Sequence, residues 1–168
     1  MSFAPHIEAL LAAKAASGLT FDEIAQKIGK PEVWTAALFY GNHVCDHETS
    51  QKIWEALGAN ASSAVKEVGV SPERVLKGLT GVNGVEGMAN RGQGMEMPPR
   101  DPTLYRLYEV LLVYGFSYKA LIREKFGDGI MSAIGFRTTL ERKETEDGPR
   151  VVITLDGKFL PYTSPDKW

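Results

Sequence analysis

Apolar residues recur at helical spacing through the first eighty residues, in short runs that each end near a glycine. The first run places Ile7, Leu10 and Leu11 on one side of a helix that stops at Gly18. Later runs predict three more short helices, over 20–28, 32–40 and 47–57. The first half of the chain is therefore expected to be a bundle of short helices.

A capping box marks the start of the second helix, because the Thr20 oxygen can accept the Glu23 amide while the Glu23 carboxylate reaches back. With the helix over 32–40 it resembles a helix-turn-helix unit, for which the functional interpretation is DNA binding. Segment 32–40 holds no Lys or Arg and one carboxylate, whereas phosphate contacts need cations. Packing is therefore the favoured role of this helix, and a DNA-binding regulator stays as the alternative function.

A long connection is expected between the two halves of the chain. Glycines and methionines recur over 78–100, with Pro98-Pro99 near the end, and too little apolar bulk is present for a regular element. The stretch lacks a Gly-Lys-Ser/Thr ending and a preceding strand, which argues against a nucleotide-binding loop. The chain is thus divided into a helical domain, a connection and a second domain, over 1–80, 81–100 and 101–168.

The second half begins with a helix. Asp101 is a good N-cap, Pro102 suits the first helical position, and an apolar face follows as far as Leu112. We expect this helix to end at Gly115 and a second one to span 118–125.

A small sheet is expected at the end of the chain. A glycine turn over 126–129 leads into predicted strands over 134–142 and 151–155, with a further hairpin turn at Asp156-Gly157. Two or three strands are too few for an independent sheet. The predicted fold class is therefore α+β, with a second domain that packs on another copy of the chain or exchanges strands with it.

Composition narrows the function classes. The net charge is −2 and the pI is about 5.9, which argues against a general polyanion binder but leaves small anions open. A single cysteine, Cys45, excludes a disulfide within the chain. With no signal-peptide pattern and no apolar stretch of about 18 residues, the expected location is the cytoplasm.

Two groups of residues could carry chemistry. The first group has three residues spaced two apart near Asp46, namely His43, Cys45 and His47. A metal site needs three or four converging ligands, so a helix junction is the favoured interpretation. Arg106 and Glu109, three apart on one helix, would ordinarily form a surface ion pair. Ser132 follows the glycine turn. A Ser–His–acid triad is not convincing, because the only histidines are His6, His43 and His47.

Three blocks of the second half together resemble one family of enzymes. They read DPTLYRLYE over 101–109, EKFGDGIMSAI over 124–134 and TLDGKFLP over 154–161. In order and spacing these blocks are similar to the cyanases (cyanate hydratases, or cyanate lyases). The helix pattern over 1–77 is also similar to the helical N-terminal domain of that family.

The resemblance implies a reaction and a site. Cyanases convert cyanate and bicarbonate into carbamate and carbon dioxide, and carbamate then yields ammonia and a second carbon dioxide. No metal or organic cofactor is implied, and the catalytic residues would be Arg106, Glu109 and Ser132. The implied partners are the small anions cyanate and bicarbonate and further copies of this chain, assembled as a decamer of five dimers with shared sites.

These residue types suit a reaction between two anions. At about 4 Å and an effective dielectric constant of 20, two monoanions repel by about 4 kcal/mol. Arg106 offers a planar fork for carboxylate oxygens, and Ser132 offers a hydroxyl donor. Glu109 would orient Arg106 and help handle the proton of bicarbonate. Because Arg106 and Glu109 sum to zero charge while the adduct is dianionic, we expect cations from a second copy at the site.

Overall fold

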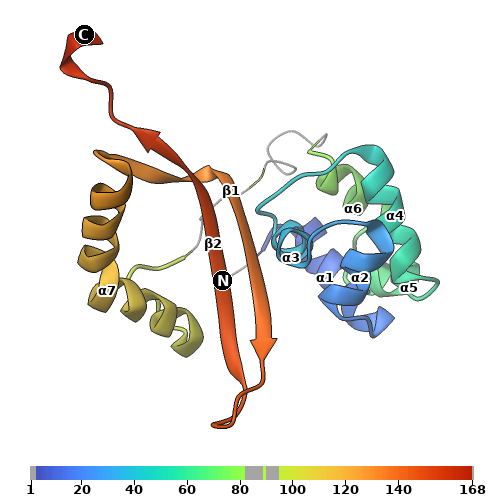
Figure 1. The fold of residues 1–168 in the computed structure, drawn as a ribbon. Coiled ribbons are helices and arrows are strands. Elements are labelled where there is room, and N and C mark those ends of the chain that lie inside the picture. Colours follow the sequence, from blue (N-terminus) through green and yellow to red (C-terminus); the bar gives the residue numbers. More distant parts are fainter. Residues whose placement is uncertain (1–2, 82–88, 90–94, 168) are drawn as a thin grey trace. The chain divides into compact units, whose positions relative to one another are not determined.

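A computed structural model describes residues 3–81, 89 and 95–167 of the chain (Figure 1). They form two compact units, one within the first 94 residues and one from Met95 onward, and each is considered by itself. Several residues of the predicted connection lie outside the described residues, namely Gly84, Gly87, Met88, Gly92 and Gly94.

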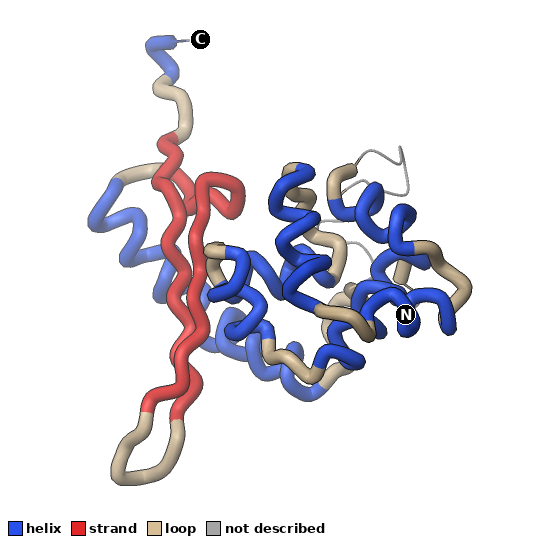
Figure 2. Tube along the Cα trace, turned by 90° about the vertical axis from the view of Figure 1, so that its right-hand side faces the viewer, coloured by secondary structure: helices blue, strands red, loops and turns tan. Residues whose placement is uncertain are grey.

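Helices are the only regular elements among the described residues of the first unit, as Figure 2 shows. Its helices are α1 (Pro5–Ser17), α2 (Phe21–Ile28), α3 (Glu32–Phe39), α4 (His47–Leu57), α5 (Ala61–Glu67) and α6 (Pro72–Leu79). Four of them were predicted, and Gly18 and Gly29 end α1 and α2 with φ values of 69° and 67°, as the glycine pattern indicated. The capping box is also confirmed: the Thr20 hydroxyl accepts the Glu23 amide at 3.1 Å, and the Glu23 carboxylate accepts the Thr20 amide at 2.7 Å.

Two helices of the first unit, α5 and α6, were not individually predicted. Ser71 caps α6 by accepting the amide of Arg74 at 3.3 Å, and Pro72 follows at its first position. The prediction that the connection starts at Gly78 is wrong, because Gly78 is buried inside α6. A Cβ atom there would lie 2.3 Å from Cδ2 of His6 on α1, so this glycine serves the close approach of two helices.

The first unit has its own hydrophobic core. Side chains from each of its helices meet there, and full burial of one large apolar side chain stabilises a fold by about 1.5–3 kcal/mol. The largest fully buried apolar residues are Leu10, Ile24, Leu38, Phe39, Ile53, Val65, Val75 and Leu79.

The second unit starts with one long helix, α7 (Pro102–Phe126). The Asp101 carboxylate caps it by accepting the amides of Thr103 at 2.9 Å and Leu104 at 3.0 Å. The prediction that a helix ends at Gly115 is wrong. One interior glycine costs about 1 kcal/mol, and Gly115 does not adopt the positive φ that a glycine helix end uses. Gly127 does, with φ of 93°, and α7 ends there.

A two-stranded antiparallel sheet follows, made of β1 (Gly129–Lys143) and β2 (Arg150–Pro161), before a short 3-10 turn at Pro165–Lys167. Both predicted strands are present, but the predicted ranges 134–142 and 151–155 are shorter at both ends than the strands of the structure. The predicted hairpin turn at Asp156-Gly157 is wrong, because β2 runs straight through it: Asp156 pairs with Arg137 and Gly157 with Phe136. Gly157 instead allows close packing of β2 against Met131 and Ser132 of β1.

The described residues of the second unit form no hydrophobic core within one chain. No residue of α7 is buried, and the only buried residue of β1 or β2 is Ser132. Phe116 of α7 is 85% exposed. The α+β fold class is confirmed, with a helical region followed by a helix and a two-stranded sheet.

Candidate active site

Arg106 and Glu109 meet on the first turns of α7. Nη1 of Arg106 donates a hydrogen bond to Oε2 of Glu109 at 2.7 Å, one turn of helix apart. Their side chains are 72% and 42% exposed, so in the single chain water screens this ion pair. One guanidinium nitrogen is bound to the carboxylate, and most of the Arg106 side chain stays exposed.

The charge of Arg106 is secure. The hydrogen bond that Arg106 donates to Glu109 raises the pKa of the guanidinium above its already high ordinary value, and the charge of Glu109 acts in the same direction. A permanent cation is therefore held on a rigid helix, where it can bind an anion without any proton uptake.

Ser132 lies in an irregular part of β1. Met131 pairs with Phe159, and the next pair joins Phe136 with Gly157. The four residues 132–135 of β1 thus stand opposite the single residue Lys158 of β2, which makes a large irregular bulge. Bulges of this kind re-aim a side chain, and here the re-aimed side chain is that of Ser132.

The Ser132 hydroxyl is held by backbone amides. Its Oγ accepts the amide of Ile134 at 3.0 Å and that of Gly135 at 2.9 Å, and the residue is 7% exposed. A hydroxyl oxygen has two lone pairs and one hydrogen. Since both lone pairs are engaged, the group is set up to donate its hydrogen rather than to act as a base or a nucleophile.

The single chain brings together only two of the three predicted residues. Among the described residues, no hydrogen bond or ion pair joins Ser132 to Arg106 or Glu109.

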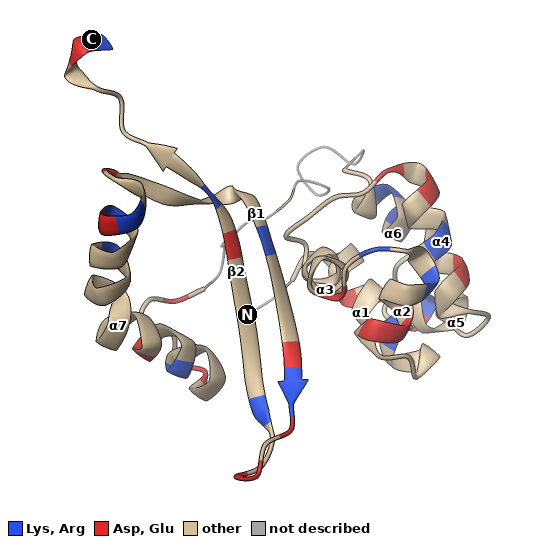
Figure 3. Cartoon of the chain, in the orientation of Figure 1, with Lys and Arg blue, Asp and Glu red and all other residues tan. Residues whose placement is uncertain are grey.

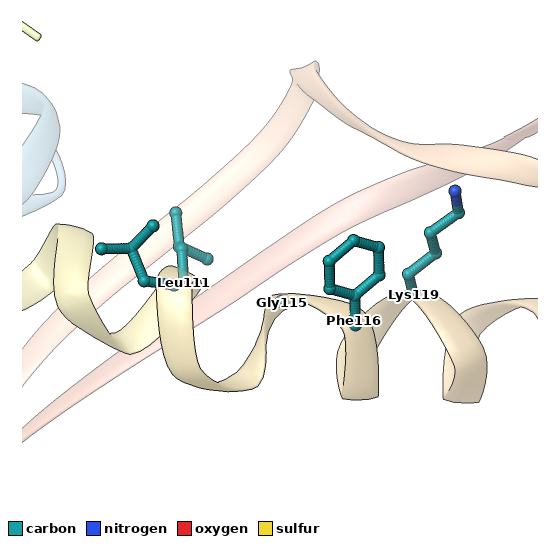
Figure 4. A pocket seen from close by; sticks show the side chains of 5 residues that line it. Leu111, Gly115, Phe116 and Lys119 are labelled. Carbon is teal, nitrogen blue, oxygen red and sulfur yellow. The ribbon is translucent and has the colours of Figure 1, made fainter. Parts of the chain in front are cut away.

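An apolar groove runs along another side of α7 (Figure 4). It has a volume of about 300 Å³ and is lined by Leu111, Leu112, Gly115, Phe116 and Lys119. At about 100° of helix rotation per residue, Gly115 lies half a turn around the helix from Arg106. The groove is therefore not part of the arginine site, and its leucines and phenylalanine suit contact with protein.

The other candidate residues do not converge on a metal site. Asp46 caps α4 by accepting the amide of Thr49 at 2.7 Å, and the His43 ring lies beside Trp34. Burial, and then the charge of Asp46, raise the pKa of Cys45 to about 11, so this thiol is protonated at neutral pH. Within the part of the chain that the structure describes, no three His, Cys, Asp or Glu side chains could hold a metal ion.

The helix-turn-helix-like pair is present as α2 and α3, yet α3 carries a single charged residue, Glu32 (Figure 3). Thr35, Leu38 and Phe39 of α3 are buried. This helix is used for packing. Among the described residues, no helix is both long and apolar enough to cross a membrane.

The sequence reasoning missed the bulge and the glycine that faces it. Gly157 was interpreted as a turn residue, although it follows Asp156 inside an alternating apolar strand. An isolated glycine within a strand pattern is a known sign of a bulge or of close backbone approach. That signal could have located the irregularity beside Ser132.

Comparison with known proteins identifies first the second unit and then the whole chain. Residues 96–164 match the cyanate lyase C-terminal domain. A cyanate hydratase of Cryptococcus neoformans is 56% identical, over 97% of this chain and 95% of that protein. The cyanate hydratase of Laccaria bicolor is 49% identical, over 92% and 84% of the two chains.

A solved structure agrees with these relatives. The crystal structure of cyanase from T. urticae matches with a TM-score of 0.65 and 30% identity, over 92% of this chain and 96% of that one. The chain belongs to the cyanate hydratase (cyanase) family.

Proposed function

We propose that this protein is a cyanate hydratase that decomposes cyanate with bicarbonate as its second substrate. The observation that carries the proposal is the 56% identity to a cyanate hydratase over nearly the full length of both chains. The activity as a lyase follows from that relationship. The bicarbonate dependence, the site residues and the assembly are parts of the proposal.

The reaction sets the demands on the site. Cyanate, bicarbonate and one proton give carbamate and carbon dioxide, and carbamate with a second proton gives ammonia and another carbon dioxide. Addition of the two substrates first forms a dianionic adduct. Bringing the two anions to about 4 Å costs about 4 kcal/mol at an effective dielectric constant of 20, so the site must supply positive charge and donors.

Arg106 supplies the cation in this proposal. Its guanidinium binds carboxylate oxygens two at a time and stays charged at every working pH. The ion pair with Glu109 at 2.7 Å supports a role for Glu109 in orienting this fork. Glu109 also lies beside the cation that would bind the adduct. From there its carboxylate can pass on the proton that the adduct takes up.

Ser132 donates a hydrogen bond to the adduct. Its two accepted amide hydrogen bonds support this role, because they leave the hydroxyl hydrogen as the group available to a ligand. A covalent intermediate on serine is not needed, since proximity and charge stabilisation account for the acceleration.

The proposed site is completed by other copies of the chain. Arg106 and Glu109 sum to zero charge, and Ser132 contacts neither of them in the single chain. The uncovered apolar side chains of α7 support an assembly, with a decamer of five dimers as the proposed form. The cytoplasmic location and the absence of a cofactor stay predictions.

Ammonia release from cyanate, with and without added bicarbonate, tests this function. Buffers stripped of carbon dioxide are needed, because the reaction itself regenerates carbon dioxide. We expect release that depends on bicarbonate and yields two carbon dioxides for each ammonia. Equal rates in stripped and bicarbonate-containing buffer would contradict the proposed second substrate.

A further inference from the structure

Gly157 lies within β2 and pairs with Phe136, the residue that directly follows the bulge that carries Ser132. It does not adopt a positive φ, so no turn requires a glycine there. A Cβ atom at this position would lie 2.4 Å from Cγ of Met131 and 2.5 Å from the carbonyl oxygen of Ser132. Side chains do not tolerate such distances, and a backbone carbonyl cannot rotate away as the end of a side chain can. The missing side chain is therefore a requirement of the bulge.

Ser132 is consequently held on two sides. Its Oγ accepts the amides of Ile134 and Gly135, which fix the side chain to the bulge. Its carbonyl lies in the space that the absent Cβ of Gly157 leaves open, which fixes the backbone against β2. Both contacts must be kept for the remaining hydroxyl hydrogen to point in one direction.

We propose that Gly157 is a positioning residue that acts on the reaction through Ser132. It lets β2 pass close enough to the bulge to set the place and direction of the Ser132 hydroxyl. This inference rests on the proposed function, in which that hydroxyl donates to the anionic adduct. Gly157 itself touches no substrate.

The direct test is Gly157→Ala in the full-length assembled protein. The added methyl group displaces the Ser132 backbone, and a misplacement of about 1 Å in a reacting group costs about a hundredfold in rate. We expect kcat to fall by about that factor with KM changed by less than about threefold, because the donor acts mainly in the transition state. Circular dichroism and sedimentation should match the wild type. Full activity of Gly157→Ala would overturn the proposal.

Gly135→Ala is the matched control, since it makes the same chemical change within the same bulge. Its Cβ would lie 3.3 Å from Cβ of Lys158 and 3.8 Å from Oγ of Ser132, which is a tight approach that a shift of a few tenths of an ångström relieves. The amide that Ser132 accepts is kept. We expect a loss below about fivefold, far smaller than that of Gly157→Ala. Equal losses in the two variants would mean that any added methyl group harms the bulge, which contradicts a specific role of Gly157.

A double-mutant cycle separates positioning from a general structural effect. If Gly157 acts only through the Ser132 hydroxyl, Gly157→Ala should cost nothing further once Ser132→Ala has removed that hydroxyl. The double variant should therefore equal Ser132→Ala within about twofold, whereas independent effects multiply. Multiplied losses would overturn the proposal.

A second double variant addresses folding. Met131→Ala removes one of the two collisions that Gly157→Ala creates and leaves the one with the Ser132 carbonyl. The Met131→Ala, Gly157→Ala protein should assemble and should still show the reduced kcat. Recovery of activity would assign the effect to Met131. Failure of both Gly157 variants to assemble would show that glycine serves the sheet alone. Either result overturns the proposal.

The same measurements distinguish this inference from the proposed function. If Ser132→Ala keeps full kcat, the role proposed for Ser132 is wrong. If Ser132→Ala is impaired and Gly157→Ala is fully active, the serine keeps its role and only the positioning by Gly157 fails.

Discussion

The two units of this protein are stabilised in different ways. The helical unit buries large side chains from every helix, and Leu10, Ile24, Phe39 and Ile53 are completely or almost completely inaccessible. The second unit has a helix of 25 residues without one buried side chain, and a sheet of two strands. A two-stranded hairpin is at best marginally stable alone. The first unit is therefore expected to fold on its own contacts, whereas the second is expected to need a partner surface.

This difference also bears on the chemistry. The proposed catalytic residues all belong to the unit without a core, and Arg106 and the apolar groove lie on the same helix. Covering that helix with another copy would exclude water from the ion pair and strengthen its interaction with an anion. Assembly and catalysis are thus expected to be lost together, while damage to the helical unit should affect stability alone.

The largest effect is expected from Phe116→Asp. Phe116 is 85% exposed in the single chain and lines the groove on α7, so in an assembly the substitution would bury an unpaired charge. We expect dissociated subunits without cyanate decomposition, measured by sedimentation and ammonia release.

Val68→Asp is the control for that substitution. Val68 is an exposed apolar residue of the helical unit, at 49%. It should leave both assembly and activity intact. Dissociation caused by Val68→Asp, or an intact and active assembly of Phe116→Asp, would contradict the claim that only the second unit carries the assembly surface.

Leu10→Ala should affect the stability of the helical unit and spare catalysis. Leu10 is fully buried in the core, and such truncations cost about 2–5 kcal/mol through lost burial and the cavity left behind. Denaturant unfolding followed by circular dichroism measures this loss. Below the new melting temperature kcat should equal that of the wild type, and a lower kcat in the folded variant would tie the helical unit to the chemistry.

Arg106→Lys should impair catalysis and leave the helical unit as stable as in the wild type. A point charge replaces a planar fork, so two-point binding of the adduct is lost, and we expect about a hundredfold fall in kcat/KM, or about 2.7 kcal/mol. Assembly should be kept, because lysine retains the positive charge beside Glu109. Near-normal turnover would remove Arg106 from its proposed role.

The smallest effect is expected from Thr20→Ala, which removes the cap of α2. Loss of such a cap costs about 1 kcal/mol and should appear in denaturant unfolding at neutral pH, with activity unchanged. Hydrogen bonds from the Thr20 backbone and then its hydroxyl lower the pKa of Glu23 below 4.5. This contribution to stability is present above pH 4.5 and is lost as the pH falls through the lowered value. Thr20→Ala removes the hydroxyl bond and keeps the backbone one, so the gap between variant and wild type should narrow only slightly in acid, and a gap that widens would contradict the capping account.

Local signals made much of the fold predictable. Caps and end glycines located α1, α2 and α4, because a capping box or a left-handed glycine depends on residues a few positions away. The spacing of Arg106 and Glu109 likewise predicted their contact, which the structure confirms at 2.7 Å.

Two of the three misinterpreted glycines have neighbours that are distant in the sequence. Gly78 meets His6, and Gly157 meets Met131 and Ser132, across gaps in sequence that no local pattern reports. Gly115 continues a helix because the residues on both sides favour it. The bulge at Ser132 depends on the register between two strands, so the residue could be singled out from the sequence but its surroundings could not.

Mixed assemblies of two inactive variants test the central claim, that each site draws its groups from more than one copy. Arg106→Ala and Ser132→Ala chains, differently tagged, are unfolded together, reassembled and purified through both tags. If Arg106 and Ser132 of one site come from different copies, activity should return to up to about a quarter of the wild-type value, since some sites then hold both native residues. Mixed assemblies as inactive as their parents would contradict the account.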